Sequence, residues 1–474
     1  MTIRTRFSPS PTGMIHLGNA RAALFSALFA KKNNGVFILR IEDTDIARSE
    51  ERYIESLQDD LHWLGIKWQE GLGVDGAYGP YRQSQRQTIY NNYFTQLQEK
   101  NLVYPCFCTD QELLLSRKLQ LSRGQAPRYA GVCRRLTAEE VEKRIQAGKK
   151  PAWRFIVPEH VMIEFIDLVK GPQQFNSSDI GDFIIRRADG SAPFLFCNAI
   201  DDAMMKISHV IRGEDHVANT PRQVLLFQAL RLPIPHYAHL SLIVGGDGAP
   251  LSKRHGSYSL HDLRSSGFLA SAILNYLVRL GHTSDVQALL SFDQLAAYFH
   301  LDKLSKSPAR FDLSQLMYWQ KTAVQALDSA SAVRWLGKEA LSQVPDNRMS
   351  LFIETVQANI EFPTDALEWA KIFFHEQVTL TDETQHIIQE AGEQFFVEAE
   401  QAVDKYGIEL PLILNDMKQT LGISGKKLFM PLRVALTGKI HGPELLHIAK
   451  LLGPEKMKHR LGRAVRVANG EASC

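Results

Sequence analysis

The first 64 residues alternate two β-type runs with two helical runs, and this order constrains the fold more than any other feature of the chain. Apolar and polar residues alternate over 3–8 as in a strand, and a helical run rich in Ala and Leu follows over 18–32. A second β-type run covers 36–41, and helical spacing returns over 52–64. Because strands connected through helices pair in parallel, the sequence predicts an α/β fold with a doubly wound, Rossmann-like parallel sheet.

The 474 residues correspond to about three domains at roughly 150 residues each. Short scattered elements interrupt the α/β pattern after about residue 100, and nearly every segment beyond Phe311 has helical periodicity. We therefore expect an α+β insertion within the α/β domain and an all-α C-terminal region. The expected boundaries are 1–100 and 190–244 for the two halves of the α/β domain, 101–189 for the insertion, 245–310 for a connecting segment and 311–474 for the helical region.

The charges are nearly balanced overall but unevenly placed. Lys and Arg total 54 against 52 Asp and Glu, so the formal net charge is only +2. Residues 117–154 carry eleven basic and three acidic residues, 425–466 carry ten and two, and 365–404 carry one Lys and ten acidic residues. Two separate basic zones favour a polyanion longer than a nucleotide as partner. A solvated helix face explains the acidic block equally well.

The sequence shows no sign of export or membrane insertion. No apolar run reaches the roughly 18 residues that a membrane span needs, and the N-terminus lacks the apolar core of a secretory signal. The five cysteines, Cys106, Cys108, Cys133, Cys197 and Cys474, are odd in number and sparse, which argues against a disulfide framework. We therefore expect a cytoplasmic protein that contacts no membrane.

The turn between the first predicted strand and the first predicted helix is one candidate site. A helix start exposes unpaired backbone N–H groups and the positive end of the helix dipole, so it suits an anion such as a triphosphate. Gly18 would let a nucleotide approach the backbone, and His16 would donate to a phosphate oxygen. A capping or packing role is the alternative for a single histidine here. The residues of this turn are Pro9, Ser10, Pro11, Thr12, Gly13, His16, Leu17, Gly18 and Asn19.

A cationic segment after a predicted strand and a glycine turn is the second candidate site. The strand is expected over 239–244 and the turn over 245–248. A basic loop on a glycine hinge can close over phosphates and stabilise charge that develops in phosphoryl or adenylyl transfer. Taken alone, a solvent-exposed basic turn explains the segment better. Its residues are Leu251, Ser252, Lys253, Arg254, His255 and Gly256.

Together, the two segments resemble the paired ATP signatures of class I aminoacyl-tRNA synthetases, known as HIGH and KMSKS. Further motifs resemble bacterial-type glutamyl-tRNA synthetases over the whole chain. They are Arg6-Phe-Ser-Pro-Ser-Pro-Thr-Gly, Arg40-Ile-Glu-Asp-Thr-Asp, Gly79-Pro-Tyr-Arg-Gln-Ser, Asn198-Ala-Ile-Asp-Asp and Val210-Ile-Arg-Gly-Glu-Asp-His. The resemblance implies a glutamate–tRNA ligase with a split catalytic domain. The insertion would bind the acceptor end of tRNA, the connecting segment its stem, and the helical region its anticodon.

The resemblance also implies roles for individual residues. His16 and Lys253 would be catalytic and act on ATP, with His216 against the nucleotide. Arg6 and Arg212 would pair with the carboxylates of glutamate, because a guanidinium grips a carboxylate with two parallel hydrogen bonds. Glu42 would face the substrate ammonium, and Arg40 and Asp43 would have structural roles. The resemblance implies that the residues of the first candidate site, Pro9, Ser10, Pro11, Thr12, Gly13, His16, Leu17, Gly18 and Asn19, bind ATP together with Leu251, Ser252, Lys253 and Arg254. It implies that glutamate is bound by Arg6, Ser8, Ser10, Glu42, Phe194, Asn198 and Arg212.

The implied reaction needs no covalent nucleophile from the protein. The glutamate carboxylate attacks the α-phosphate of ATP, and the terminal ribose hydroxyl of tRNA then attacks the adenylate, with Mg²⁺ bridging the phosphates. The implied partners are therefore ATP, L-glutamate and tRNA(Glu). The family resemblance also favours a monomer.

Departures from the family pattern bear on the site. Residues 249–250 are Ala and Pro where the second signature usually begins with Lys or another polar residue, and Phe194 stands where other members can carry Tyr. Three cysteines, at 106, 108 and 133, match the zinc-ligand spacing of some bacterial members, but Arg135 stands where a His ligand is expected. Because zinc requires four ligands and a cation opposes its binding, we expect structural thiols and no metal site.

Three alternatives remain open. In the first, the enzyme charges tRNA(Gln) as well as, or in place of, tRNA(Glu); members that reject tRNA(Gln) can use an Arg at the anticodon, and 356–361 has none. The second, a shortened relative that attaches glutamate to a modified base, lacks an anticodon region, whereas this chain continues for more than 150 residues past Phe311. The third, a nucleotidyltransferase or RNA-binding protein with the HIGH turn, lacks a glutamate pocket.

Overall fold

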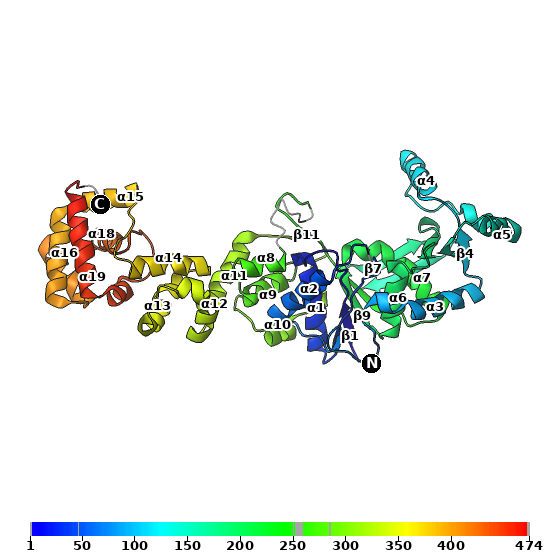
Figure 1. Ribbon diagram of the computed structural model, residues 1–474, viewed down its shortest axis with the longest axis horizontal. Coiled ribbons are helices and arrows are strands. Elements are labelled where there is room, and N and C mark those ends of the chain that lie inside the picture. The colour runs from blue at the N-terminus through cyan, green and yellow to red at the C-terminus, as the bar shows by residue number, and fades with distance from the viewer. Residues whose placement is uncertain (1, 46, 250, 252–258, 284–285, 472–474) are drawn as a thin grey trace. The chain divides into compact units, whose positions relative to one another are not determined.

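The computed structural model describes residues 2–45, 47–249, 251, 259–283 and 286–471 (Figure 1). Its described residues fall into two compact units, one formed by Met1–Ser265 with Ile273–Leu313 and the other by Ser266–Ala272 with Ser314–Cys474. The first unit combines strands and helices, and the second is helical. The predicted fold class, α/β followed by an all-α region, is therefore confirmed.

The strands of the first unit are β1 (Arg4–Phe7), β2 (Val36–Leu39), β3 (Glu70–Gly71), β4 (Val103–Cys106), β5 (Ala152–Phe155), β6 (Met162–Asp167), β7 (Gly171–Asn176), β8 (Phe183–Arg186), β9 (His209–Gly213), β10 (His236–Leu240), β11 (Ile243–Val244) and β12 (Ala309–Arg310). The helices up to Tyr298 are α1 (Leu17–Lys32), α2 (Glu51–Trp63), α3 (Gln87–Glu99), α4 (Asp110–Ser122), α5 (Ala138–Gln146), α6 (Phe194–Met204), α7 (Thr220–Leu230), α8 (Leu260–Ser265), α9 (Ala270–Arg279) and α10 (Phe292–Tyr298). A short 3₁₀ helix, η4 (Glu214–Asn219), follows β9 directly.

Parallel strands form the centre of the first unit. β1, β2 and β3 pair in parallel, as do β9, β10 and β6, with β7 antiparallel at the outer edge. Hydrogen bonds from Ser208 N to Arg4 O (2.9 Å) and from Arg4 N to Ser208 Oγ (2.7 Å) connect the start of β9 to β1. The order of strands reverses between β1 and β9. In α/β sheets, ligands bind past the carboxyl ends of the strands at such a reversal.

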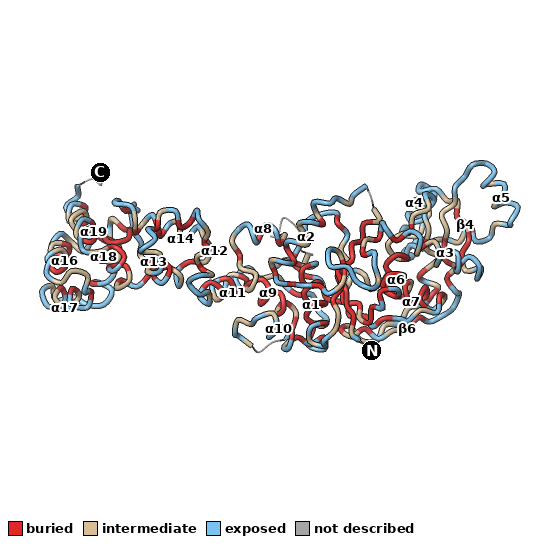
Figure 2. Tube along the Cα trace, turned by 60° about the horizontal axis from the view of Figure 1, so that its bottom comes forward, coloured by how far each residue is buried: buried red, intermediate tan, exposed pale blue. Residues whose placement is uncertain are grey.

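Helix α1 is buried on most of its surface because it packs against β1, β2 and β9 on one side and α10 on another. Its Ala-rich sequence suits this position, since small side chains permit close packing on both sides. Figure 2 shows long buried stretches in α1, α6 and α7, whereas α4 and α5 of the predicted insertion have no buried residue. Among these helices, the ones next to the strand reversal are therefore the most deeply buried.

The single strand predicted over 239–244 is wrong, because the chain changes partners within it. β10 pairs with β9, and β11 pairs with β12. Residues 241 and 242 lie between the two strands. Within the segment 101–189, β6 and β7 belong to the sheet of β9 and β10, whereas β4, β5 and β8 form a separate antiparallel sheet. The domain boundaries given above stay predictions.

Helices alone occur among the described residues from 311 to 471, as the periodicity predicted. Their apolar faces share one core that includes Phe352, Phe373, Phe396 and Leu461. No helix in the described part of the chain is long and apolar enough to cross a membrane. The helices are α11 (Leu313–Gln325), α12 (Ser329–Leu341), α13 (Met349–Val356), α14 (Pro363–Phe374), α15 (Asp382–Ala391), α16 (Glu393–Tyr406), α17 (Leu410–Leu421), α18 (Lys426–Thr437) and α19 (Leu445–Ala468).

Candidate active site

His16 is the N-cap residue of α1, directly after the turn that follows β1. Its Nδ1 accepts a hydrogen bond from Gly18 N at 3.1 Å, which fixes the neutral ring with its proton on Nε2. The residue is exposed, yet partial burial of the ring lowers its pKa, an effect that the charge of Asp215 opposes. The imidazole thus caps the helix and still has an Nε2–H donor available for a phosphate oxygen.

Gly18 is required by the histidine itself. A Cβ at residue 18 would lie 2.9 Å from Cε1 and 3.0 Å from Nδ1 of His16. Any larger residue would displace the ring from the helix start. This packing differs from the sequence-based prediction that Gly18 lets a nucleotide approach the backbone.

The other residues of the first turn divide into an exposed face and a buried anchor. Leu17 is 1% exposed, so its side chain belongs to the core and only its backbone can face a ligand. The loop is tied down by hydrogen bonds from Glu42 N to Pro9 O (3.0 Å) and from Glu50 N to Pro11 O (3.1 Å). The residues of the turn that are exposed are Ser10, Thr12, Gly13 and Asn19.

The second predicted segment is described only at its margins, because Ser252, Lys253, Arg254 and the rest of 252–258 lie outside the described residues. Before it, the half-buried Leu251 donates from its backbone N to Ile243 O at 3.2 Å. After it, Ser259 forms an antiparallel bridge with His16, and Leu260 N donates to Ile15 O at 2.9 Å. The chain therefore returns to the start of α1 directly after this segment.

Arg212, in β9, is a buried cation that has no carboxylate partner among the described residues. Its guanidinium donates from Nε to His239 Nε2 (3.1 Å) and from Nη2 to Thr220 Oγ1 and Gln223 Oε1 (2.8 Å each). Nη1 is buried and has no hydrogen-bond partner in the part of the chain that is described. Burial lowers the pKa of Arg212 to about 10. A buried guanidinium with an unused donor favours an anionic ligand.

A chain of hydrogen bonds connects Arg212 to Glu42. Gln223 Nε2 donates to Asn198 Oδ1 at 2.9 Å, and Asn198 Nδ2 donates to Glu42 Oε1 at 2.5 Å. Burial raises the pKa of Glu42 to about 7, although the charges of neighbouring arginines oppose this shift. Three residues predicted for glutamate binding thus belong to one buried network.

Arg6 is buried and faces Asp202. Its Nε lies 3.2 Å from Oδ1 and its Nη2 3.4 Å from Oδ2 of that carboxylate, while its Nη1 makes no hydrogen bond with the described residues. Arg40, which is fully buried, donates to Asp202 from Nη1 (2.8 Å) and to Glu42 from Nη2 (3.3 Å). Arg40 therefore holds both carboxylates in place, and the predicted role of Arg6 in binding a carboxylate stays a prediction.

Ser8, Phe194 and His216 lie around the same strand ends. Ser8 directly follows β1, and its Oγ is buried without a partner among the described residues. Phe194 begins α6, and its ring centroid lies 5.5 Å from that of His216 in η4. Burial and the charge of Arg212 lower the pKa of His216 to about 4, so the ring is neutral at pH 7. A neutral aromatic pair of this kind can pack against a nucleobase.

Sequence reasoning missed the side chains that orient the predicted ones. Asp202 had a visible signal, because the Asn198-Ala-Ile-Asp-Asp motif places two acids in a helix whose other residues, apart from Asn198, are apolar. Thr220, Gln223 and His239 had no local signal, since their contacts depend on how α7 and β10 pack beside β9. Long-range packing brings them to Arg212.

The cysteines at 106, 108 and 133 do come together, with their Sγ atoms all within 4.8 Å of one another. The hydroxyl of Tyr129 lies 3.5 Å from Sγ of both Cys106 and Cys108 and is a fourth potential donor that the sequence analysis missed. Arg154 Nε donates to Cys106 Sγ at 3.2 Å. Burial raises the pKa of Cys106, but its hydrogen bonds with Tyr129 and Arg154 lower this pKa overall. The expected absence of a metal stays a prediction.

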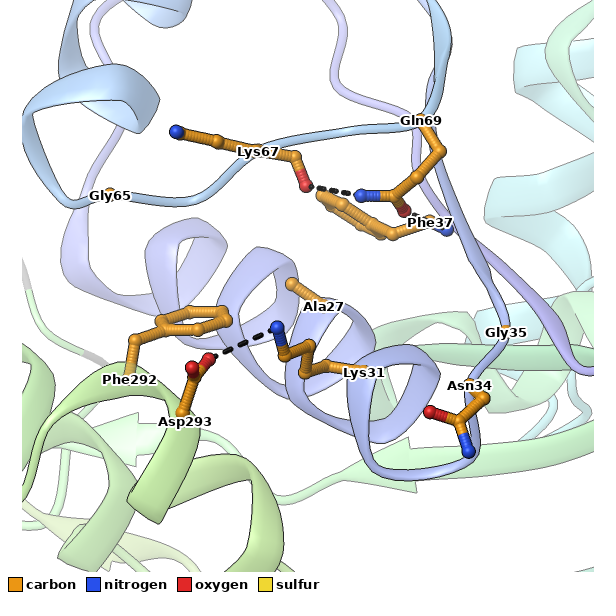
Figure 3. A pocket seen from close by; sticks show the side chains of 10 residues that line it. All are labelled: Ala27, Lys31, Asn34, Gly35, Phe37, Gly65, Lys67, Gln69, Phe292 and Asp293. Atoms are coloured by element: carbon orange, nitrogen blue, oxygen red, sulfur yellow. Dashed lines mark hydrogen bonds and ion pairs between the residues drawn. The ribbon is translucent and has the colours of Figure 1, made fainter.

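A hollow of about 610 Å³ lies away from these groups (Figure 3). Gly35 and Phe37 line it at the amino end of β2, and Lys67 and Gln69 line it just before β3. Because the strands are parallel, the hollow lies at the amino ends of β2 and β3, opposite to Ser8 and to the carboxyl end of β9. It is therefore separate from the candidate active site.

Comparison with known proteins identifies the family of the chain. Residues 2–318 match the family described as class I tRNA synthetases (E and Q), catalytic domain, and residues 322–465 match an anticodon-binding domain. Glutamate–tRNA ligase 2 of Nitrosococcus oceani is 53% identical over 98% of each chain, and the enzyme of that name from Coxiella burnetii is 50% identical over 98% of this chain and 99% of its own. The chain belongs to the glutamate–tRNA ligases, which are class I aminoacyl-tRNA synthetases.

A solved structure shows the same family relation in three dimensions. The crystal structure of a glutamate tRNA ligase from Elizabethkingia meningosepticum, in complex with its amino acid, superposes with a TM-score of 0.88 at 30% identity and covers 98% of this chain and 99% of its own. The match extends through both compact units. This synthetase is therefore an enzyme with a catalytic domain of Rossmann type and a helical anticodon-binding region.

Proposed function

We propose that this synthetase joins L-glutamate to the 3′ end of tRNA(Glu) in two steps, with glutamyl-adenylate as the intermediate. The observation that carries the proposal is the unused Nη1 donor of Arg212, which is buried, lacks a carboxylate partner among the described residues and lies at the reversal of the sheet. A substrate carboxylate at this position would accept from Nη1 and neutralise the buried charge. Glu42, reached through Asn198, would accept from the substrate ammonium.

In the first step, an oxygen of the glutamate α-carboxylate attacks the α-phosphorus of ATP, and pyrophosphate leaves. MgATP is the substrate, and Mg²⁺ offsets the charge of its phosphates. His16 would donate from Nε2 to a phosphate oxygen at the amino end of α1, where the helix dipole also favours an anion. Lys253 would add a second positive charge at the same phosphates. The protein thus acts by positioning and by electrostatic stabilisation.

In the second step, the terminal ribose hydroxyl of tRNA attacks the carbonyl carbon of the adenylate, and AMP leaves. The basic residues of 117–154 would bind phosphates near the acceptor end, and those of 425–466 would bind the anticodon arm. These assignments follow from the charge distribution in the chain and from the two matched domains.

Charging assays with purified tRNA test the proposal. Labelled glutamate should appear on the 3′ end of tRNA(Glu) with release of one AMP per glutamate attached, and labelled glutamine should not be attached. Failure to charge any tRNA with glutamate would refute the proposal. Pyrophosphate release that precedes charging in a rapid-quench experiment would support the two-step order, and simultaneous release would contradict it.

Charging of tRNA(Gln) is the second candidate function, and one observation favours it. Gln357, in the segment 356–361 that lacks Arg, turns inward and donates from Nε2 to the carbonyl oxygens of Val324 and Leu327 at 2.8 Å. It is therefore committed to the end of α11 and does not present a side chain with which to reject an anticodon base. Charging rates measured separately on tRNA(Glu) and tRNA(Gln) distinguish a selective from a non-discriminating enzyme.

The proposal also includes expectations about oligomeric state, cellular location and metal content. The enzyme would act as a monomer in the cytoplasm and would hold no metal of its own beyond the Mg²⁺ that accompanies ATP. Light scattering on the purified enzyme with and without tRNA tests the first of these, since a mass of twice the chain would contradict it.

A further inference from the structure

Two charged side chains hold a single peptide unit where the chain leaves the parallel sheet. This unit joins Ser241 to Leu242, between β10 and β11. Arg21 donates from Nη2 to the oxygen of Ser241, and Leu242 N donates to Glu214 Oε1 at 2.7 Å. Both polar groups of the peptide are thus bonded to side chains, whereas most backbone hydrogen bonds in folded proteins join two backbone groups.

The two side chains come from the elements that bear the proposed ATP residues. Arg21 lies on α1, one turn after its amino end at His16. Glu214 begins η4, between Arg212 and His216. The Ser241–Leu242 peptide therefore ties the start of α1, the end of β9 and the beginning of β11 to one point.

Arg21 is unusual in its own surroundings. It is 4% exposed, and its second contact, from Nη1 to Leu280 O at 3.2 Å, is again a carbonyl. Its Nε has no partner among the described residues. Burying a guanidinium among neutral acceptors is costly, so packing alone does not account for an Arg at this position. The planar fork does, because it reaches two carbonyls from separate segments at once.

Glu214 accepts a hydrogen bond from this peptide with one carboxylate oxygen, while its other oxygen is held by an ion pair. Its Oε2 forms an ion pair with Lys170, which also donates to Lys306 O. Oε1 is thereby directed at Leu242 N. This arrangement separates two functions of one carboxylate, because the ion pair orients the side chain and the second oxygen holds the backbone.

We infer that Arg21 and Glu214 are positioning residues that hold the Ser241–Leu242 peptide and, through it, set β11 against the amino end of α1. The inference rests on the proposed binding of ATP at His16. β11 leads through the turn at Gly245 to Leu251, and the chain pairs with His16 again at Ser259. A shift of this peptide should therefore weaken the binding of ATP at His16 and leave the binding of glutamate unchanged.

Variants at Glu214 test the inference cleanly, because this side chain is partly exposed. Glu214→Ala should raise both the Kd for ATP, measured by calorimetry without tRNA, and the KM for ATP in charging by about tenfold. The KM values for glutamate and tRNA should stay within about twofold of the wild type. Glu214→Gln keeps an oxygen for Leu242 N and should restore ATP binding. Lys170→Met removes the ion pair and the hydrogen bond to Lys306 O but leaves both oxygens of Glu214 in place. It is the matched control and should bind ATP nearly as well as the wild type.

If the role of Glu214 is purely structural, Glu214→Ala should lower the melting temperature and change the KM values for ATP, glutamate and tRNA together, and Glu214→Gln should bind ATP no more tightly than Glu214→Ala. That result would overturn the inference. An unchanged Kd for ATP in Glu214→Ala would overturn it as well. If Glu214→Ala does not fold, Arg21→Lys gives the same test, because an ammonium cannot reach both carbonyls. Calorimetry with ATP requires no charging. A wild-type enzyme that binds ATP but attaches no glutamate would therefore refute the proposed function while leaving the comparison of Kd values decisive for the positioning pair.

Discussion

Arg212→Lys is the substitution that tests the glutamate site most directly. The native guanidinium uses Nε and Nη2 for His239, Thr220 and Gln223, and among the described residues Nη1 has no partner and is available for a substrate carboxylate. A lysine keeps the charge but is a single point and cannot satisfy these acceptors and the substrate together. Loss of one buried, charge-assisted contact costs about 2 kcal/mol at the low end of the usual range. This corresponds to a decrease of about 30-fold in kcat/KM for glutamate.

Steady-state charging with varied glutamate, at saturating ATP and tRNA, measures this decrease. The KM for ATP should change little, because the contacts of Arg212 lie in the glutamate network. Arg222→Lys is the matched control: Arg222 lies on α7 close to the same network, is half-buried and donates to the carbonyls of Ala218 and Ile180. If kcat/KM for glutamate is the same in Arg212→Lys and in the wild type, or falls equally in Arg222→Lys, the carboxylate site has been misplaced.

Three further predictions concern protonation, the loop and the thiols. The pKa of Glu42 is raised by burial to about 7, so kcat/KM for glutamate should fall as pH drops through 7, and Glu42→Gln should lack this limb. A raised pKa in the folded state means that the folded protein binds this proton more tightly than the unfolded chain does. The contribution of Glu42 to the free energy of unfolding is therefore fully present below pH 4.5 and is lost as pH rises through about 7. Denaturant unfolding measured against pH checks this direction, because Glu42→Gln should lack this pH dependence. Lys253→Ala should slow glutamate activation without a change in melting temperature, and equal activation rates would exclude a role for this lysine. Metal analysis should find only substoichiometric zinc, and one equivalent that disappears in Cys108→Ser would contradict this and point to Tyr129 as the fourth ligand.

The sequence alone was sufficient for the elements that local patterns define. Helix α1, which spans Leu17–Lys32, begins one residue before the predicted helix over 18–32 and ends where it was predicted to end. The all-helical character beyond residue 311 follows from a period that each segment carries by itself. The turn at His16 was also visible, because Pro and Gly residues restrict the backbone locally and the helix start is a local electrostatic feature. Motif resemblance then identified the family, which the matched domains confirm.

Only the tertiary structure determined which partner each buried charged side chain has. Arg6 and Arg212 read alike in the sequence, yet Arg6 faces Asp202 whereas Arg212 has only neutral partners among the described residues and a free donor. The break between β10 and β11 likewise has no sequence signal, because a run of apolar residues does not reveal which strand it will pair with. Strand and helix preferences act over a few residues. The energy of a buried charge depends on every group within several ångströms, and those groups come from segments as far as 259 residues apart.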